Sequence, residues 1–461
     1  WSGGRVGTES GFDLGMRDLL VSRDLRVAAF TRGTGKTQFL CASPLTGSAL
    51  AGLALHSVCE GVFLNSSPLQ HPVEPLVISW AEAGQTHCAR WRSESGAPVP
   101  RRVVLADDTL SADAAYRLAC EGTAMLWRGD FQNARQLLQA LARRIDRKPR
   151  RHRQPPAPPT VPVSLAHAFN LYRLARSQRA RTLGMLLLPF DAGHNLSLRR
   201  APDVRRACTE AYGPAQEPYV TSLRELLGLI GAHEWRKKGV EIAALADPAP
   251  QRIHPHYGVY SPVRGEYVGL VASAPLPALV AENGLAFDIG TGTGVLAAVL
   301  ARRGVARIVA TDQDPRALAC ARENLAQLGL AARVDVVQAD LFPPGRAALI
   351  VCNPPWVPAR PSSPIEHAVY DPESRMLRGF LSGLAEHLEP GGEGWLILSD
   401  LAEHLGLRSR DELSAWIGAA GLKVLGRMDA RPTHPKAADD TDPLHAARAA
   451  EVTSLWRLAP K

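Results

Sequence analysis

The chain has 461 residues, enough for two to four domains at roughly 100–200 residues each. Its composition, 46% apolar and 21% charged, is typical of a globular protein and argues against a coiled coil, a collagen-like fibre or a disordered chain. The sequence contains neither an apolar run of about 18 residues nor a basic-then-apolar leader, so we expect a cytoplasmic protein without a membrane segment. Seven scattered cysteines without a Cys-x-x-Cys spacing predict neither disulfides nor a bound metal.

The net charge of +8 is unevenly distributed along the chain. Residues 143–206 contain fourteen Arg and one Lys against three Asp, a net +12, so the remainder carries −4. Arginine binds phosphate or carboxylate through a planar fork, which predicts that this segment docks a macromolecular acceptor, RNA or protein. A solvated charged surface without a partner is the alternative.

The first half of the chain shows weaker patterns. Residues 1–75 are an ill-defined extension, in which residues 25–31 and 37–41 are expected to pair as a hairpin. Apolar residues at helical spacing predict mainly helical accessory regions over residues 76–146 and 164–252, with a candidate strand at residues 182–189. Residues 147–163, rich in Pro and Arg, are interpreted as an exposed linker.

Residues 253–461 alternate short apolar runs with amphipathic helical stretches. Each run is five or six residues long, the length of a buried strand. This alternation predicts an α/β fold with a doubly wound, mostly parallel sheet covered by helices on both faces. The expected strands are residues 285–289, 307–311, 334–338, 348–352 and 394–399.

A glycine-rich turn follows the first of these strands. Gly290, Gly292 and Gly294 alternate with two threonines after Asp288, and a predicted helix begins directly afterwards. Glycines here allow a tight turn and the approach of a ligand to the helix N-terminus. Asp312 ends the next strand, where a carboxylate can accept both hydroxyls of a ribose. These residues predict a nucleoside-containing cofactor.

The glycine spacing narrows the choice of cofactor. A dinucleotide fingerprint would require glycine at position 295, which is valine here. The sequence Asp-x-Gly-x-Gly-x-Gly instead resembles the first motif of class I S-adenosylmethionine-dependent methyltransferases, over about residues 255–461. The resemblance implies a Rossmann-like sheet of seven strands, with S-adenosylmethionine as cofactor and Asp312 on its ribose. The residues it assigns to the cofactor are Asp288, Gly290, Thr291, Gly292, Gly294, Asp312, Asp340 (at the adenine amino group) and Asn353.

A candidate catalytic loop, Asn353-Pro354-Pro355-Trp356, follows residues 348–352 at the expected carboxyl edge of the sheet. A planar amide or ring-amino nitrogen is a poor nucleophile because its lone pair is delocalised. If Asn353 Oδ1 and the carbonyl oxygen of Pro354 accept its two N–H bonds, the nitrogen is oriented toward a sulfonium methyl group. The prolines stiffen the loop, and Trp356 offers a flat face for stacking. The expected methyl transfer is a direct displacement without a metal.

This loop is similar to a motif in release-factor glutamine methyltransferases, small-domain rRNA guanine methyltransferases and amino-methylating DNA methyltransferases. Pro262-Val-Arg264-Gly-Glu266 is similar to a stretch that precedes the first motif in the glutamine enzymes, although Trp356 stands where they usually have Tyr. The resemblance implies an N-methyltransferase acting on a planar nitrogen of a macromolecule, either an RNA base or a protein glutamine. The alternatives are a small planar metabolite as acceptor and a cofactor-binding module without turnover.

Two further groups of polar residues lie near these motifs. His254 and His256 flank a proline and are expected to be solvated loop residues more than substrate contacts. Residues 370–375 fit the rim of a pocket and the N-terminal cap of a helix equally well.

Overall fold

The computed structural model describes residues 27–32, 36–41, 76–147, 164–214, 216–246, 249–361, 364–432 and 442–461. The chain divides into two units, residues 1–72 and residues 73–461. In the first unit, β1 (Val27–Arg32) and β2 (Lys36–Cys41) form an antiparallel hairpin, which confirms the predicted pairing. The second unit contains two larger sheets.

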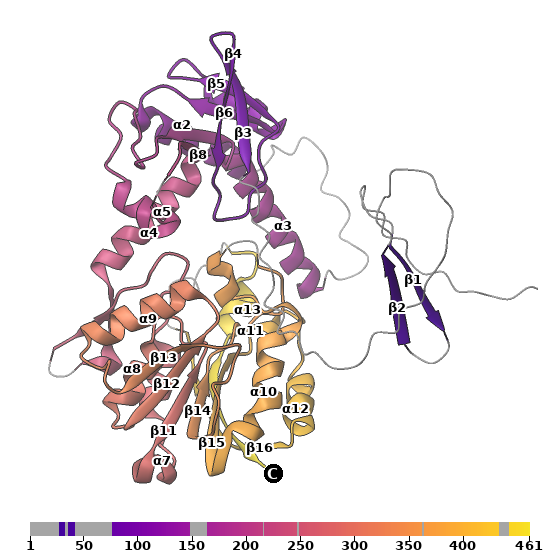
Figure 1. Ribbon diagram of the computed structural model, residues 1–461, viewed down its shortest axis with the longest axis vertical. Coiled ribbons are helices and arrows are strands. Elements are labelled where there is room, and N and C mark those ends of the chain that lie inside the picture. The colour runs from indigo at the N-terminus through magenta and orange to yellow at the C-terminus, as the bar shows by residue number, and fades with distance from the viewer. Residues whose placement is uncertain are drawn as a thin grey trace, which may run out of the picture. The chain divides into compact units, whose positions relative to one another are not determined.

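Seven strands of the second unit form one sheet in the order β13-β12-β11-β14-β15-β17-β16 (Figure 1). The pairs from β13 to β15 are parallel, and β17 is antiparallel to both β15 and β16. This order confirms the doubly wound, mostly parallel sheet of seven strands. The strands are β11 (Leu285–Ile289), β12 (Arg307–Asp312), β13 (Val334–Gln338), β14 (Ala347–Cys352), β15 (Leu388–Ser399), β16 (Leu422–Ala430) and β17 (Thr453–Pro460).

Helices cover both faces of this sheet, and successive strand residues point into different cores. Ala286 of β11 packs in the core with α6, α8 and α9, whereas its neighbour Phe287 packs in the core with α10 and α12. Figure 1 shows these two helix groups on opposite sides of the strands. The helices are α6 (Glu266–Ser273), α7 (Ala278–Asn283), α8 (Val295–Arg302), α9 (Pro315–Gln327), α10 (Arg375–His387), α11 (Leu401–His404), α12 (Arg410–Ala419) and α13 (His445–Ala450).

The structure corrects the expected make-up of the accessory region. Beside the helices, residues 76–222 form a six-stranded sheet in the order β3-β4-β8-β7-β6-β5, where the sequence predicts mainly helices. The strands are β3 (Val77–Glu82), β4 (Gln85–Trp91), β5 (Arg102–Ala106), β6 (Thr123–Trp127), β7 (Leu186–Phe190) and β8 (Tyr219–Ser222). The helices are α1 (Ala112–Cys120), α2 (Phe131–Asp146), α3 (Leu165–Leu183), α4 (Arg205–Tyr212) and α5 (Leu223–Lys238).

β6 shows why the sheet escapes prediction. All five residues of Thr123–Trp127 are buried, and the run lies between the amphipathic helices α1 and α2. A short continuous apolar run has no period of its own, so it merges with the helical pattern on either side. Gly122, at a φ of 77°, makes the turn that separates α1 from β6.

Short elements join the accessory sheet to the seven-stranded sheet. β9 (Val240–Ile242) and β10 (Gln251–Ile253) pair antiparallel around a 3-10 turn at Ala243–Leu245. Two further 3-10 turns, Pro364–Ala368 and Pro372–Ser374, precede α10. The predicted linker, residues 147–163, lies outside the described residues except for Arg147.

Candidate active site

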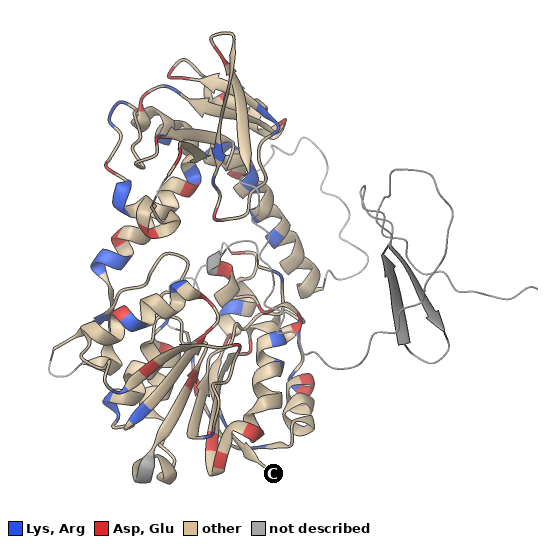
Figure 2. Ribbon diagram, in the orientation of Figure 1, with Lys and Arg blue, Asp and Glu red and all other residues tan. Residues whose placement is uncertain are grey.

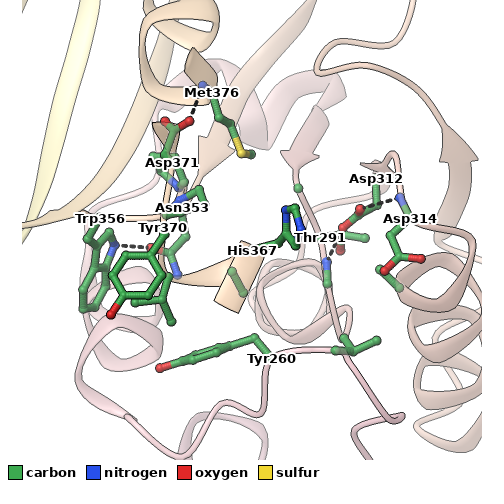
Figure 3. Close-up of a pocket in the computed structure, with 18 of the residues that line it drawn as sticks. Tyr260, Thr291, Asp312, Asp314, Asn353, Trp356, His367, Tyr370, Asp371 and Met376 are labelled. Atoms are coloured by element: carbon green, nitrogen blue, oxygen red, sulfur yellow. Dashed lines mark hydrogen bonds between the residues drawn. The ribbon is translucent and has the colours of Figure 1, made fainter. Parts of the chain in front are cut away.

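A cavity of about 1370 Å³ lies at the carboxyl ends of β11, β12 and β14 (Figure 3). Its walls include the glycine turn after β11, Asp312, and the loop Asn353–Trp356, together with residues around Tyr260 and Tyr370. Ligand pockets usually measure about 300–1000 Å³, so this cavity has room for a second reactant beside a cofactor-sized molecule. The two motifs found in the sequence therefore face one space.

Asp288 supports the glycine turn from beneath. Its side chain is buried, and Oδ2 accepts hydrogen bonds from Thr291 Oγ1 at 2.6 Å and from the N–H of Ala297 at 3.1 Å. Burial raises the pKa of Asp288 to about 6, and these two donors oppose the shift. Asp288 thus fixes the turn against the start of α8, which is a positioning contact more than a contact with a ligand.

The glycine turn needs its glycines for two different reasons. Gly292 has a φ of 55°, and a Cβ there would meet nothing within 4 Å, so the position opens onto the cavity. Gly290 has a φ of 72°, and a Cβ there would stand 2.5 Å from Met376 Cε. Gly294 closes the turn against Ala321 of α9, and Thr291 donates its N–H to the carbonyl oxygen of Thr311 at 2.8 Å.

Asp312 is the carboxylate that the structure presents to the cavity. Oδ2 accepts the N–H of Gly292 at 3.0 Å, and Oδ1 accepts the N–H of Asp314 at 3.0 Å. Burial raises the pKa of Asp312, and these backbone donors oppose the rise. Each oxygen keeps a lone pair for a further donor, so the carboxylate is both held in place and able to bind.

Asp340 lies at the rim of the same cavity and is already engaged. It accepts hydrogen bonds from Gln313 Nε2 and from Arg375 Nη2, the latter at 3.0 Å, and 61% of its side chain is exposed. An exposed ion pair of this kind is weak. The predicted role at an adenine amino group would require Asp340 to share its oxygens with these partners.

Asn353 follows β14, and its orientation is set by Trp356. The indole Nε1–H of Trp356 donates to Asn353 Oδ1 at 2.8 Å, drawn as a dashed line in Figure 3. Pro354 is buried and Pro355 half-buried between them. The sequence predicts Trp356 as a stacking face, and the structure adds a hydrogen bond from its indole N–H, a group that can only donate.

Further cavity residues come from segments that the motifs do not contain. Tyr260 precedes the Pro262–Glu266 stretch and Tyr370 bridges to Val357, so both face the Asn353 loop (Figure 3). Proximity to recognisable motifs is a usable sequence signal for Tyr260. Met376 carries no such signal because it acts by filling space beside Gly290.

Residues 370–375 combine the two interpretations that the sequence leaves open. Asp371 Oδ1 and Oδ2 accept the N–H groups of Met376 and Leu377, each at 3.1 Å, and so cap α10. Tyr370 and Arg375 line the cavity on either side of this cap. The segment is therefore both a helix cap and a rim.

The two histidines at the start of this domain, expected to be solvated, instead make contacts within the protein. His256 Nε2 lies 2.7 Å from Glu323 Oε2 of α9, and burial lowers the pKa of His256. His254 Nδ1 lies 2.7 Å from the carbonyl oxygen of Arg236 at the end of α5. These contacts fasten the accessory region to α9.

Six of the eleven arginines that the structure describes in residues 143–206 pair with acidic residues. Five of these pairs are Arg144–Asp113, Arg179–Asp146, Arg199–Asp130, Arg200–Asp130 and Arg205–Asp203. Figure 2 shows basic and acidic residues interspersed over the described elements. Arg173 instead contacts the rim of the cavity, pairing with Glu366 at 3.5 Å. Lys148, Arg150, Arg151 and Arg153 lie outside the described residues.

Within the described residues, no group of three or more His, Cys, Asp or Glu side chains is placed to hold a metal ion. No helix in this part of the chain is long and apolar enough to cross a membrane. Five cysteines in residues 76–461 are free thiols: Cys88, Cys120, Cys208, Cys320 and Cys352.

Comparison with known proteins matches the domain that holds the cavity. Residues 252–410 fit the model of the family described as methyltransferase small domain. The chain is 38% identical over 173 residues to the release factor glutamine methyltransferase of Cereibacter sphaeroides, covering 36% of this chain and 57% of that protein. It is 30% identical over 221 residues to the ribosomal protein L11 methyltransferase of Sorangium cellulosum, covering 44% and 62%. A solved S-adenosylmethionine-dependent methyltransferase from Geobacter sulfurreducens, in complex with S-adenosyl-L-homocysteine, aligns with 42% of this chain and 90% of its own, at 19% identity and a TM-score of 0.29.

The sheet order and the glycine turn agree with the resemblance to class I S-adenosylmethionine-dependent methyltransferases. More particularly, residues 252–410 match the methyltransferase small domain family. The chain spans less than two thirds of the two curated relatives, and the accessory sheet lies outside the family match. The similarity to these proteins therefore extends over one domain and not over the whole chain.

Proposed function

We propose that this domain transfers a methyl group from S-adenosylmethionine to a planar amide or amino nitrogen of a protein. The observation that carries the proposal is the position of Asn353 Oδ1, on the same cavity as Asp312 and Gly292. A carboxylate suited to a ribose and a carbonyl oxygen suited to an acceptor N–H thus face one space. This pairing is what a transfer between two bound molecules requires.

The residues around Gly292 fit the cofactor. Gly292 leaves open the space that a Cβ would enter, so a ligand can lie directly against the backbone there. Asp312, held by the N–H groups of Gly292 and Asp314, would accept the two ribose hydroxyls. When bound, S-adenosylmethionine supplies a methyl group on a sulfonium.

The acceptor is recognised by two oxygens. Asn353 Oδ1 and the carbonyl oxygen of Pro354 would accept the two N–H bonds of a planar nitrogen, which turns its lone pair toward the methyl group. As the nitrogen gains positive charge, both hydrogen bonds strengthen, and this differential stabilisation lowers the barrier. One N–H proton then leaves to solvent. No metal is required by this arrangement.

A protein acceptor is supported by the relatives, whose names specify a release factor glutamine and ribosomal protein L11. A glutamine carboxamide presents the planar NH₂ group that the two oxygens fit. An RNA base amine has the same donor geometry and is distinguished by experiment.

The cofactor assignment predicts a specific loss of affinity. Asp312→Ala should weaken S-adenosylmethionine binding about 10- to 100-fold, because a hydrogen bond to a charged acceptor contributes about 1.5–3 kcal/mol. Isothermal calorimetry measures it, with Asp335→Ala, an exposed Asp on β13 paired with Arg307, as control. Heat with NAD and none with S-adenosylmethionine would contradict the assignment.

The acceptor assignment is tested by following a labelled methyl group. We expect label from S-adenosylmethionine to enter purified bacterial release factor or ribosomal protein L11. Asn353→Ala should reduce the rate about 10²- to 10³-fold with cofactor affinity unchanged. Asn133→Ala, which removes an exposed Asn of α2 that donates to Asp108, is the control. Label in bulk RNA alone would transfer the proposal to a base amine.

A further inference from the structure

Four side chains form an unbroken line of contacts behind the acceptor end of the cavity. Glu451, between α13 and β17, pairs with Arg264 ahead of α6. Arg264 lies over the ring of Trp356, and Trp356 donates to Asn353. The line joins residues that are 187 positions apart at its widest pair.

The contact between Trp356 and Asn353 fixes the direction of the carboxamide. A side-chain amide can flip, exchanging its oxygen for its NH₂ group, and only the oxygen accepts from an indole N–H. The 2.8 Å bond from Trp356 Nε1 therefore selects the orientation in which Oδ1 points toward Trp356. It also occupies one of the two lone pairs of Oδ1, which leaves one for an acceptor N–H.

Arg264 holds the indole plane. Its guanidinium carbon lies 5.7 Å from the centroid of the Trp356 ring, within the range of a cation–π contact. The same guanidinium makes a two-pronged bond to Glu451, from Nη1 to Oε1 at 2.9 Å and from Nη2 to Oε2 at 3.1 Å. Trp356 is half-buried among three apolar clusters, so its plane is held by packing as well.

Glu451 anchors the line in the core of the sheet. Its side chain has 0% exposure, and Ser399 Oγ, at the end of β15, donates to Oε1 at 2.7 Å. A buried carboxylate that accepts hydrogen bonds from three donor groups is held in one orientation. The position of the Arg264 guanidinium is therefore set by Glu451, two residues before β17, which Ser399 at the end of β15 holds in turn.

We propose that Glu451 and Arg264 are positioning residues that orient Asn353 through the indole N–H of Trp356. This inference rests on the proposed function and deepens it. Trp356 serves as a hydrogen-bond donor with one face covered by Arg264, so at most its other face remains for stacking. The single free lone pair of Oδ1 restricts the acceptor to one N–H at Asn353, with its second N–H directed to Pro354.

The geometry is tested without any acceptor. In ¹⁵N-labelled full-length protein, the indole N–H resonance that disappears in Trp356→Phe identifies Trp356. Arg264→Lys keeps a charge opposite Glu451 but loses the planar group, so this resonance should shift. The matched control is Arg457→Lys, because Arg457 makes the same two-pronged bond to the buried Glu393 elsewhere in the sheet. An unmoved Trp356 resonance in Arg264→Lys would overturn the proposal.

The consequence for turnover is tested with release factor and labelled S-adenosylmethionine. Trp356→Phe should lower kcat about 10- to 100-fold while the cofactor Kd stays within two-fold, because the ring remains and the orienting bond is lost. Arg264→Lys should lower kcat in the same direction, and Arg457→Lys should not. Wild-type kcat in Trp356→Phe would refute the orienting role. A wild-type protein that methylates no protein would refute the proposed function, whereas the indole spectra would still decide the line of contacts.

Discussion

Asp288 and Asp312 lie on the neighbouring strands β11 and β12, and their carboxylates have different roles. The buried side chain of Asp288 accepts hydrogen bonds from Thr291 Oγ1 and from the N–H of Ala297. Asp312 is held by backbone N–H groups and keeps lone pairs for a ligand. One aspartate thus supports the glycine turn, and the other is available to a ligand. The two differ because Asp288 is buried and Asp312 lines the cavity.

The pKa of Asp288 makes the stability of the chain depend on pH. Folding raises it to about 6, whereas an unfolded aspartate titrates near about 3.9. Between these values the folded state binds more protons, so this group's contribution falls as pH rises from about 4 to about 6. Asp288→Asn does not titrate. The stability of wild type relative to Asp288→Asn should therefore fall by up to about 3 kcal/mol between pH 4 and pH 7.5.

Urea unfolding of both proteins at several pH values measures this difference. Taking wild type minus variant removes the titration of groups that the two proteins share. Parallel stability curves over the whole range would show that Asp288 does not titrate in this window.

Helix α10 links the cavity to the sheet at the level of an element. Asp371 caps its N-terminus, and Leu377, Phe380 and Leu384 of the helix pack on the core with Phe287. The cap adjoins Tyr370, which lines the cavity. The position of the rim therefore depends on the first turn of a helix whose own position is set by the core.

Removing the cap should affect stability and acceptor binding together. Asp371→Ala should cost about 0.5–2 kcal/mol and raise the acceptor KM, because the first turn of α10 frays beside Tyr370. Ser409→Ala removes the cap of α12, whose capping box lies in the same domain, and provides the control for stability alone. Denaturant unfolding and steady-state kinetics measure the two effects. Equal acceptor KM values in both variants would contradict a role for the cap at the rim.

A strand or a site residue can be predicted from sequence when the pattern that marks it lies within a few neighbouring residues. Gly290, Gly292 and Asp312 are recognisable because one turn and one strand contain them, and Asn353 because prolines follow it at a strand end. β6 is not, since its buried run has no period. Glu451 is not either, because a contact across 187 residues with Arg264 leaves no mark in local spacing.

The accessory region contacts the methyltransferase domain near both halves of the cavity. On the cofactor side, Arg316 of α9 lies two residues after Asp314 and pairs with Glu94 at 2.7 Å. On the acceptor side, Arg173 of α3 lies 4.2 Å over the ring of Tyr370 and donates to the carbonyl oxygen of Arg360. Two separate contacts thus join the accessory region to the methyltransferase domain, one at Arg316 and one at Tyr370.

The acceptor-side contact predicts a selective effect on acceptor binding. Arg173→Ala should raise the acceptor KM about 3- to 30-fold, the range of a cation–π contact of about 0.5–2 kcal/mol, without changing the cofactor Kd. Arg179→Ala, on the same helix, removes a pair with Asp146 inside the accessory region and is the control. Kinetics with release factor and calorimetry with S-adenosylmethionine separate the two constants. A parallel loss of cofactor affinity would show that Arg173 supports the fold instead.

The place of β17 in the sheet has a consequence for the protein while it is being synthesised. β17 inserts between β15 and β16, and Glu451 lies two residues before its first residue, Thr453. The glycine turn, Asp312 and Asn353 leave the ribosome about a hundred residues earlier, as a contiguous set of strands that can pair among themselves. We therefore expect a nascent chain to form the strand ends around the cavity before Glu451 can pair with Arg264, because that contact waits for β17, the strand next to the edge strand β16.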